Sequence, residues 1–160
     1  MVEEEVWAFD DGYGDNKLHN GVSNILVPSH CTTWIRKLKE EVMEKSGKVD
    51  PLSHIGLEID GLGGMYLIGE GALTQDPSLN WAGGANKHKD TNFPVIAKAC
   101  LGLLAGAKPK SIVAPLVMGL PVNEDESIER HALLEEIMVG THKLTLYLAD
   151  GSVQAKEVTV

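Results

Sequence analysis

Residues 8–18 of the chain read AFDDGYGDNKL. The apolar residues 6–9 predict a strand, which leads directly into the carboxylates of Asp10 and Asp11 and then into a Gly-x-Gly turn. Glycines let the backbone adopt positive φ angles, and the successive N–H groups of such a turn form a concave anion site. Lys17 can add a positive charge to the same anion, and a carboxylate can hold a hydrated Mg²⁺ beside it. The stretch therefore predicts a nucleotide phosphate site, with a plain β-hairpin closed by an acidic, glycine-rich turn as the alternative.

The chain has 160 residues, of which 43% are hydrophobic and 5% aromatic, and a formal net charge of −9. This length allows one domain with a hydrophobic core. The acidic balance argues against direct binding to nucleic acid or to an anionic membrane, and no apolar run reaches the length of a membrane span. The two cysteines and six histidines show no metal or redox spacing, so no structural metal is expected. Together with an N-terminus unlike a secretory signal, the unpaired cysteines predict reduced thiols in a cytoplasmic protein.

Turn residues and hydrophobic periodicity predict alternating hairpins and helices. Strands are expected over 5–9, 16–27 (as one strand or two), 55–59, 65–68, 111–119, 144–148 and 153–160. Helices are expected over 34–46, from a cap at Thr91 or Asn92 to residue 104, and over 124–138. Residues 69–72 are expected to end a strand, and 76–90 to form a surface loop. This order of elements predicts an α/β domain with mixed sheets.

Two of these segments carry more specific expectations. Residues 111–119 are expected to form a single buried strand of the kind found in parallel sheets, although Pro115 fits a central strand poorly. In the helix over 124–138, His131 is expected to lie on the apolar side with Ile128 and Leu134 and to be buried in the core.

The Asp-x-Gly-x-Gly pattern after an N-terminal strand, followed by a lysine that leads into the next strand, resembles the first phosphate loop of the actin/Hsp70/sugar-kinase superfamily. The motif in this chain, DDGxxxxKL, is most similar to that of the plasmid-segregation actins of the ParM/StbA type. Residues 117–122, VMGLPV, resemble the strand and proline turn of those proteins, and residues 87–95 resemble the loop that leads into their first long helix. The resemblance implies an RNase H-like (actin-like) lobe with a mixed, mainly five-stranded sheet flanked by helices.

The resemblance also implies roles for individual residues. Asp10 would hold Mg²⁺ through water, the loop after it would present backbone N–H groups to the phosphates of ATP or GTP, and Lys17 would touch phosphate. Tyr13 departs from the Ser or Thr that is commoner in this loop, so the resemblance implies contact with phosphate through its backbone. The phosphate-binding residues expected on this basis are Asp11, Gly12, Tyr13, Gly14, Asn16 and Lys17.

Family ATPases close on the nucleotide from two lobes, and residues 1–160 would be the N-terminal lobe, with the C-terminal lobe absent from this chain. The second phosphate loop and the Glu or Gln that orients the attacking water would lie in the missing part. We therefore expect no catalytic residue in the chain and, for the chain alone, little ATPase activity, because phosphoryl transfer needs all these groups together.

The complete protein would associate with itself into filaments and reach plasmid DNA through a DNA-binding adaptor. Two alternatives stay open on the sequence: a solitary, non-catalytic actin-like lobe that regulates assembly, and a lobe of a sugar- or acetate-kinase-like phosphotransferase.

Overall fold

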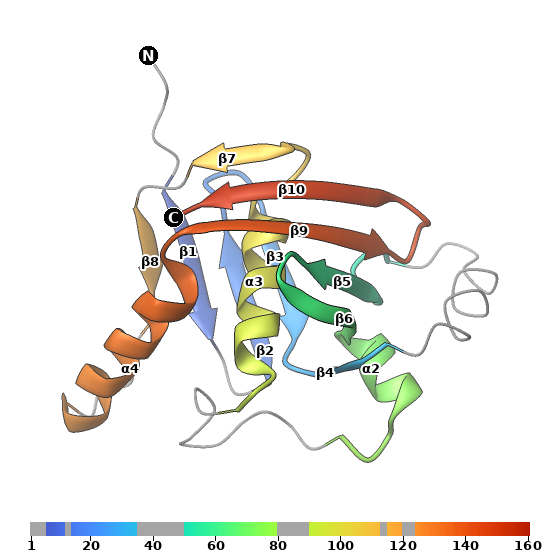
Figure 1. The fold of residues 1–160 in the computed structure, drawn as a ribbon, viewed down its shortest axis with the longest axis horizontal. Helices are drawn as coiled ribbons and strands as arrows, with labels where there is room; N and C mark the ends of the chain where they lie inside the picture. The colour runs from blue at the N-terminus through green and yellow to red at the C-terminus, as the bar shows by residue number, and fades with distance from the viewer. Residues whose placement is uncertain (1–5, 12–13, 35–49, 80–89, 113–114, 120–123) are drawn as a thin grey trace.

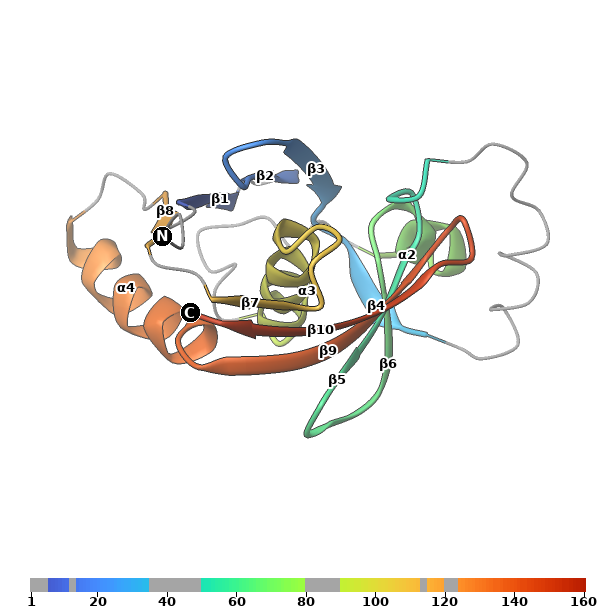
Figure 2. The same cartoon turned by 90° about the horizontal axis from the view of Figure 1, so that it is seen from above.

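The computed structural model describes residues 6–11, 14–34, 50–79, 90–112, 115–119 and 124–160. Two mixed β-sheets lie on opposite sides of helix α3 (Phe93–Leu104), which contacts β2 and β3 of one sheet and β9 and β10 of the other (Figures 1 and 2). No helix in these residues is long and apolar enough to cross a membrane.

The smaller sheet has the strand order β3-β2-β1-β8 and the larger one the order β4-β6-β5-β9-β10-β7. The strands of the smaller sheet are β1 (Trp7–Asp11), β2 (Asp15–His19), β3 (Asn24–Pro28) and β8 (Leu116–Met118). Those of the larger sheet are β4 (Cys31–Thr33), β5 (Ile55–Ile59), β6 (Leu62–Ile68), β7 (Lys110–Ile112), β9 (Thr141–Leu148) and β10 (Val153–Thr159). The other helices in the described residues are α2 (Glu70–Gln75) and α4 (Glu124–Met138). The expected mixed α/β architecture is confirmed, but its strands form sheets of four and six rather than one mainly five-stranded sheet.

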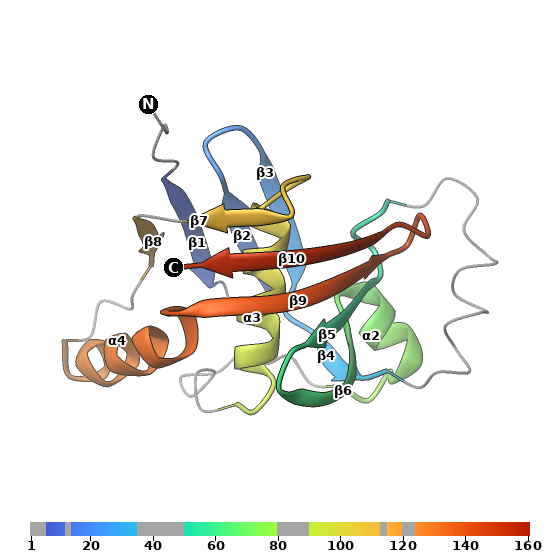
Figure 3. The same ribbon diagram turned by 45° about the horizontal axis from the view of Figure 1, so that its top comes forward.

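The segment between α3 and α4 joins the two sheets. β7 pairs in parallel with β10, and β8 pairs in parallel with β1, so the expected parallel pairing is confirmed (Figure 3). The expectation of a single buried strand over 111–119 is wrong, because β7 and β8 belong to different sheets and Val117 in β8 is 53% exposed. Pro115, which cannot donate to a strand ladder, lies between them, and its carbonyl oxygen accepts a hydrogen bond from Trp7 N.

Helix α3 forms the centre of the core. Ten of its 12 residues are buried, which is more than the single face of an amphipathic helix, because a sheet covers α3 on each side. Gly102 allows the helix to lie close to β9, since a Cβ at this position would come within 2.5 Å of Leu144 Cδ1. The end of α3 is held from both sheets: Asn20 Nδ2 donates to Leu104 O, and Lys156 Nζ donates to Gly106 O.

Helix α4 begins and ends where the sequence predicts, but of its expected buried face only Leu134 is buried. Ile128 is 74% exposed, and His131 is exposed on the surface with its Nδ1 3.8 Å from a carboxylate oxygen of Glu135. Leu134 and Ile137, in the C-terminal half of α4, are buried, and Figure 1 shows that the helix projects away from the sheets toward its N-terminal end.

Other expectations had mixed outcomes. The expected hairpins are confirmed as β5–β6 and β9–β10, and residues 16–27 form two strands. The strand does end before residues 69–72, because β6 stops at Ile68, but Glu70 then begins α2, a helix that sequence analysis missed. The expected helix over 34–46 lies outside the described residues except for Trp34, which is not helical, and the expected loop over 76–90 is described only in part.

Candidate functional site

The hairpin of β1 and β2 sets Asp10 opposite Lys17 and Asp11 opposite Asn16. Because successive side chains of a strand point to opposite faces, Asp10 and Lys17 share one face of the sheet. Lys17 Nζ lies 3.9 Å from Asp10 Oδ2, and the two side chains are 68% and 62% exposed. An ion pair this exposed contributes little to stability, so both charges remain available to a ligand.

The carboxyl ends of two parallel strands meet at Asp10. β8 runs parallel to β1, and just past its end a Cβ on Gly119 would come within 3.5 Å of Asp10 Oδ1. Gly119 N also donates to Phe9 O. Ligands of open α/β sheets bind outside the carboxyl ends of the strands, so Asp10 lies where this rule places a ligand.

The loop after Asp11 is described only at its end. Gly12 and Tyr13, two of the predicted phosphate-binding residues, lie outside the described residues. Gly14 is described, and its carbonyl oxygen accepts a hydrogen bond of 2.9 Å from Ser29 N. The last residue of the predicted loop is therefore attached to the segment that follows β3.

Asn16 lies on the other face of β2 from Lys17 and is completely buried. Its Nδ2 donates to Val27 O at 3.2 Å and to Ser29 Oγ at 3.0 Å. Both amide hydrogens thus have partners within the protein, and the side chain is turned away from the exposed charges. The alternation of β2 could have indicated this orientation, because the apolar Leu18 is two residues further along on the same face.

Sequence analysis did not single out Ser29 as a site residue. Its contact with Gly14 and Asn16 depends on the register between β2 and β3, in which Asp15 lies opposite Pro28. No local pattern in the sequence signals that register.

An open hollow of about 430 Å³ adjoins the two exposed charges. It is lined by Ala8, Asp10, Lys17, Leu18, His19, Asn24, Ile25 and Leu26. His19 Nδ1 and Asn24 Oδ1 share a hydrogen bond of 2.9 Å on its rim. Asp10 and Lys17 therefore border a concave surface that a ligand could enter.

The geometry fits a magnesium ion held through water better than one held directly. The described residues contain no cluster of three or more His, Cys, Asp or Glu side chains that could enclose a metal ion. Mg²⁺ commonly keeps several of its waters and is bound by one or two carboxylates together with substrate phosphates. A single exposed carboxylate such as Asp10 is sufficient for that mode.

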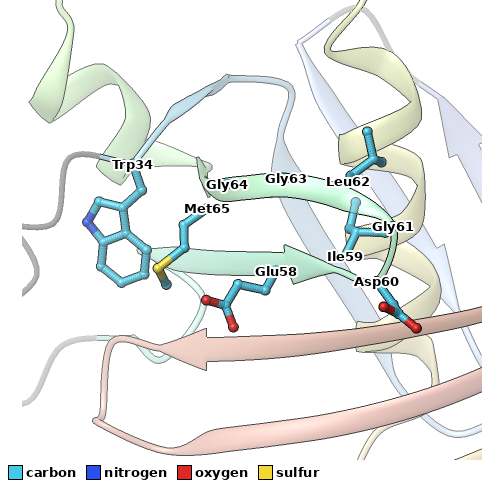
Figure 4. A pocket seen from close by; sticks show the side chains of 9 residues that line it. All are labelled: Trp34, Glu58, Ile59, Asp60, Gly61, Leu62, Gly63, Gly64 and Met65. Atoms are coloured by element: carbon cyan, nitrogen blue, oxygen red, sulfur yellow. The ribbon is translucent and has the colours of Figure 1, made fainter.

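A larger pocket, of about 730 Å³, lies on the six-stranded sheet and contains none of the predicted site residues (Figure 4). Trp34 covers Gly56 of β5, where a Cβ would collide with the indole ring. The same ring meets Tyr147 edge to face at 6.1 Å, and Tyr147 Oη donates to Glu58 Oε2 at 2.7 Å. These contacts explain how Trp34 is packed, and they give no indication of a ligand.

The sequence of residues 8–160 matches the model of the family described as actin-like proteins, N-terminal domain. This chain therefore belongs to the actin-like proteins, and the family resemblance expected from residues 8–18 is confirmed. No curated protein sequence matches it.

Solved structures show the same fold. The apo ParM protein of pSK41 superposes with a TM-score of 0.72 at 18% identity, over 98% of this chain and 47% of that one. The ParM of a 15-stranded filament from Clostridium botulinum gives 0.68 at 18% identity, over 99% of this chain and 45% of that one. Bacillus thuringiensis ParM with AMPPNP gives 0.56 at 19% identity, over 97% and 43%. The chain thus spans less than half the length of these proteins, and at such identities the likeness establishes the fold.

Proposed function

We propose that this chain is the nucleotide-binding half of a polymerising actin-like ATPase, and that residues 10–17 hold the phosphates of ATP or GTP. The observation that carries the proposal is the exposed pair of Asp10 and Lys17 at the carboxyl ends of β1 and β8. A solved relative of the same fold is described as Bacillus thuringiensis ParM with ATP.

Each residue has a defined role in this proposal. The Lys17 ammonium group neutralises phosphate charge, and Asp10 holds Mg²⁺ through water. Backbone N–H groups after β1 cradle the phosphate oxygens, as they do in other glycine-rich turns. The residues of this cradle are Asp11, Gly12, Tyr13 and Gly14.

The activity of the whole protein needs a second lobe. Hydrolysis of the nucleotide requires a positioned water and stabilisation of charge on the transferred phosphoryl group, neither of which residues 10–17 supply alone. We propose that a C-terminal lobe supplies them, and that this chain by itself binds nucleotide weakly and hydrolyses it very slowly.

The partners follow from the relatives and from charge. Filament structures are described for ParM from Clostridium botulinum and for AlfA from a Bacillus subtilis plasmid, which supports self-association into filaments here. The net charge of −9 disfavours direct contact with DNA, so attachment to plasmid DNA would pass through a DNA-binding adaptor. The proposed location is the cytoplasm.

The test is a titration of the chain with ATP and Mg²⁺, in which the amide NMR signals of residues 10–17 are monitored. Weak binding, in the millimolar range, should shift these signals, and Asp10→Ala and Lys17→Ala should each abolish the shifts. Lys143→Ala, which removes a comparably exposed lysine of β9, is the matched control and should bind as the unaltered chain does. If the signals of residues 10–17 do not move, the phosphate site is refuted. Micromolar binding would instead refute the proposal that this chain is only half of a nucleotide site.

A further inference from the structure

A series of buried polar groups connects the end of the predicted phosphate loop to the segment after β3. Ser29 N donates to Gly14 O at 2.9 Å, and Asn16 Nδ2 donates to Ser29 Oγ at 3.0 Å. Asn16 Nδ2 also donates to Val27 O. Asn16 and Ser29 are both 0% exposed, so water does not compete for these bonds.

Ser29 N extends the pairing of β2 with β3 by one step into the loop. The register pairs Asp15 with Pro28 and therefore sets Gly14 opposite Ser29. Hydrogen-bonded and non-hydrogen-bonded pairs alternate in an antiparallel ladder, so the Pro28 nitrogen points away from β2 and the next bond of the ladder runs from Ser29 N to Gly14 O. Gly14 is therefore fixed from the β3 side, although it precedes β2.

A buried amide is unfavourable unless its hydrogen bonds compensate for the lost water. Asn16 occupies a core-facing position of β2, and its Oδ1 has no hydrogen-bond partner among the described residues. An apolar residue such as the neighbouring Leu18 would suit this face better if packing alone mattered. Of the two bonds that Asn16 Nδ2 makes, one reaches Val27 O and the other reaches Ser29 Oγ, on the residue that holds Gly14.

We propose that Asn16 and Ser29 are positioning residues that fix Gly14, the last residue of the proposed phosphate loop, in the position from which it helps to receive nucleotide. This inference rests on the proposed function, since it assigns the loop to phosphate. Asn16 acts by orienting Ser29, and Ser29 acts by holding the Gly14 carbonyl; neither side chain touches the ligand. A preorganised loop binds more tightly because less ordering remains to be done on binding.

The test compares Asn16→Ala and Ser29→Ala with the control Ile96→Val. Ile96 is fully buried in α3 and makes none of the bonds in question, and its shortening should lower stability by an amount similar to the loss of one hydrogen bond. The first measurement is hydrogen exchange of the residue 29 amide, a group that all three variants retain. The second is the dissociation constant of Mg·ATP, measured by NMR titration under conditions where each variant is folded.

If the proposal holds, the amide of residue 29 exchanges faster in Asn16→Ala than in the unaltered chain. The increase is at least about tenfold greater than the increase expected from the lower global stability alone. The affinity for Mg·ATP falls about threefold to tenfold in both alanine variants, and the double variant binds no more weakly than the weaker single one. In Ile96→Val the residue 29 amide changes only as the other core amides do, and the affinity is unchanged. Should Asn16→Ala not fold, Ser29→Ala, which removes a single oxygen atom, decides the affinity measurement.

The two proposals fail in different ways. If the unaltered chain binds Mg·ATP but both alanine variants match Ile96→Val in exchange and affinity, the positioning role is overturned and the phosphate site stands. If the unaltered chain does not bind Mg·ATP, the proposed function fails. Accelerated exchange at residue 29 in Asn16→Ala would then still support the positioning of Gly14, and unchanged exchange would overturn that positioning.

Discussion

At Gly69, just before α2, the backbone adopts φ of 82° and ψ of −151°, a combination that is essentially restricted to glycine. Gly69 N donates to His30 O, so this residue ties the start of α2 to the segment that follows Ser29. We expect Gly69→Ala to lower the free energy of unfolding by about 1–3 kcal/mol, as urea denaturation would measure. Gly63→Ala is the control, because nothing lies within 4 Å of a Cβ there, and it should change stability by less than about 0.5 kcal/mol. Equal effects of the two substitutions would contradict the assigned strain.

Cys31 in β4 is 4% exposed, and burial, helped by the negative charge of Asp90, raises the pKa of its thiol to about 12 from an ordinary value of 9.0. The thiolate is the reactive form, so we expect this thiol to resist alkylation at neutral pH. In a Cys100→Ala variant, a thiol reagent should label Cys31 slowly in the native protein and completely in denaturant. Fast labelling without denaturant would show that β4 is open to solvent.

The same shift predicts a pH dependence. The folded protein holds the Cys31 proton more tightly than the unfolded chain does, so its contribution to stability is fully present below about pH 9 and is lost as the pH rises toward 12. Replacement by Ser, whose hydroxyl does not titrate in this range, should reduce the loss of stability measured by denaturation between pH 9 and pH 11. An unchanged alkaline profile would contradict the raised pKa.

At the scale of the elements, α3 ends in bonds from both sheets. Lys156 is 5% exposed on β10, its pKa is lowered by burial, and its Nζ donates to Gly106 O and to Lys108 O just beyond the helix. Lys156→Met keeps the apolar stem but removes the donor to those carbonyl groups. We therefore expect the free energy of unfolding to fall by about 1–3 kcal/mol. Lys143→Met on the exposed face of β9 should change stability by less than about 0.5 kcal/mol. If Lys156→Met left the free energy of unfolding unchanged, packing of the side-chain stem would outweigh the hydrogen bonds.

The elements that sequence predicts well are those with local signals. Asp-Gly turns mark the hairpins at Asp60 and Asp150, and acidic residues in the first turn mark the start of α4. The glycines around residue 70 indicated a turn, so α2 was not predicted. The strands within residues 110–118 belong to different sheets because they pair with β10 and β1, which are distant in sequence. The prediction that His131 is buried failed for a similar reason. Its exposure depends on how α4 projects from the sheets, which no local pattern contains.

The candidate site shows the same division. The charges of Asp10 and Lys17 and the turn between them are adjacent in sequence, and their pairing in one hairpin follows from strand and turn residues. The inward orientation of Asn16 can be deduced from the alternation of β2, but its partner Ser29 is 13 residues away and is brought to it by the β2–β3 register.

For the molecule as a whole, the position of α3 between the sheets predicts that both unfold together. Ile96 is 0% exposed in α3, and the helix contacts strands of both sheets. Ile96→Val should lower the free energy of unfolding by about 0.5–1.5 kcal/mol. In native-state hydrogen exchange, the slowest amides of β2 and of β9 should then accelerate by the same factor, because loss of α3 packing exposes both sheets at once. Val153→Ala, at a 60% exposed position of β10, should leave both sets unchanged. Acceleration confined to one sheet would show that the two sheets are separate cooperative units.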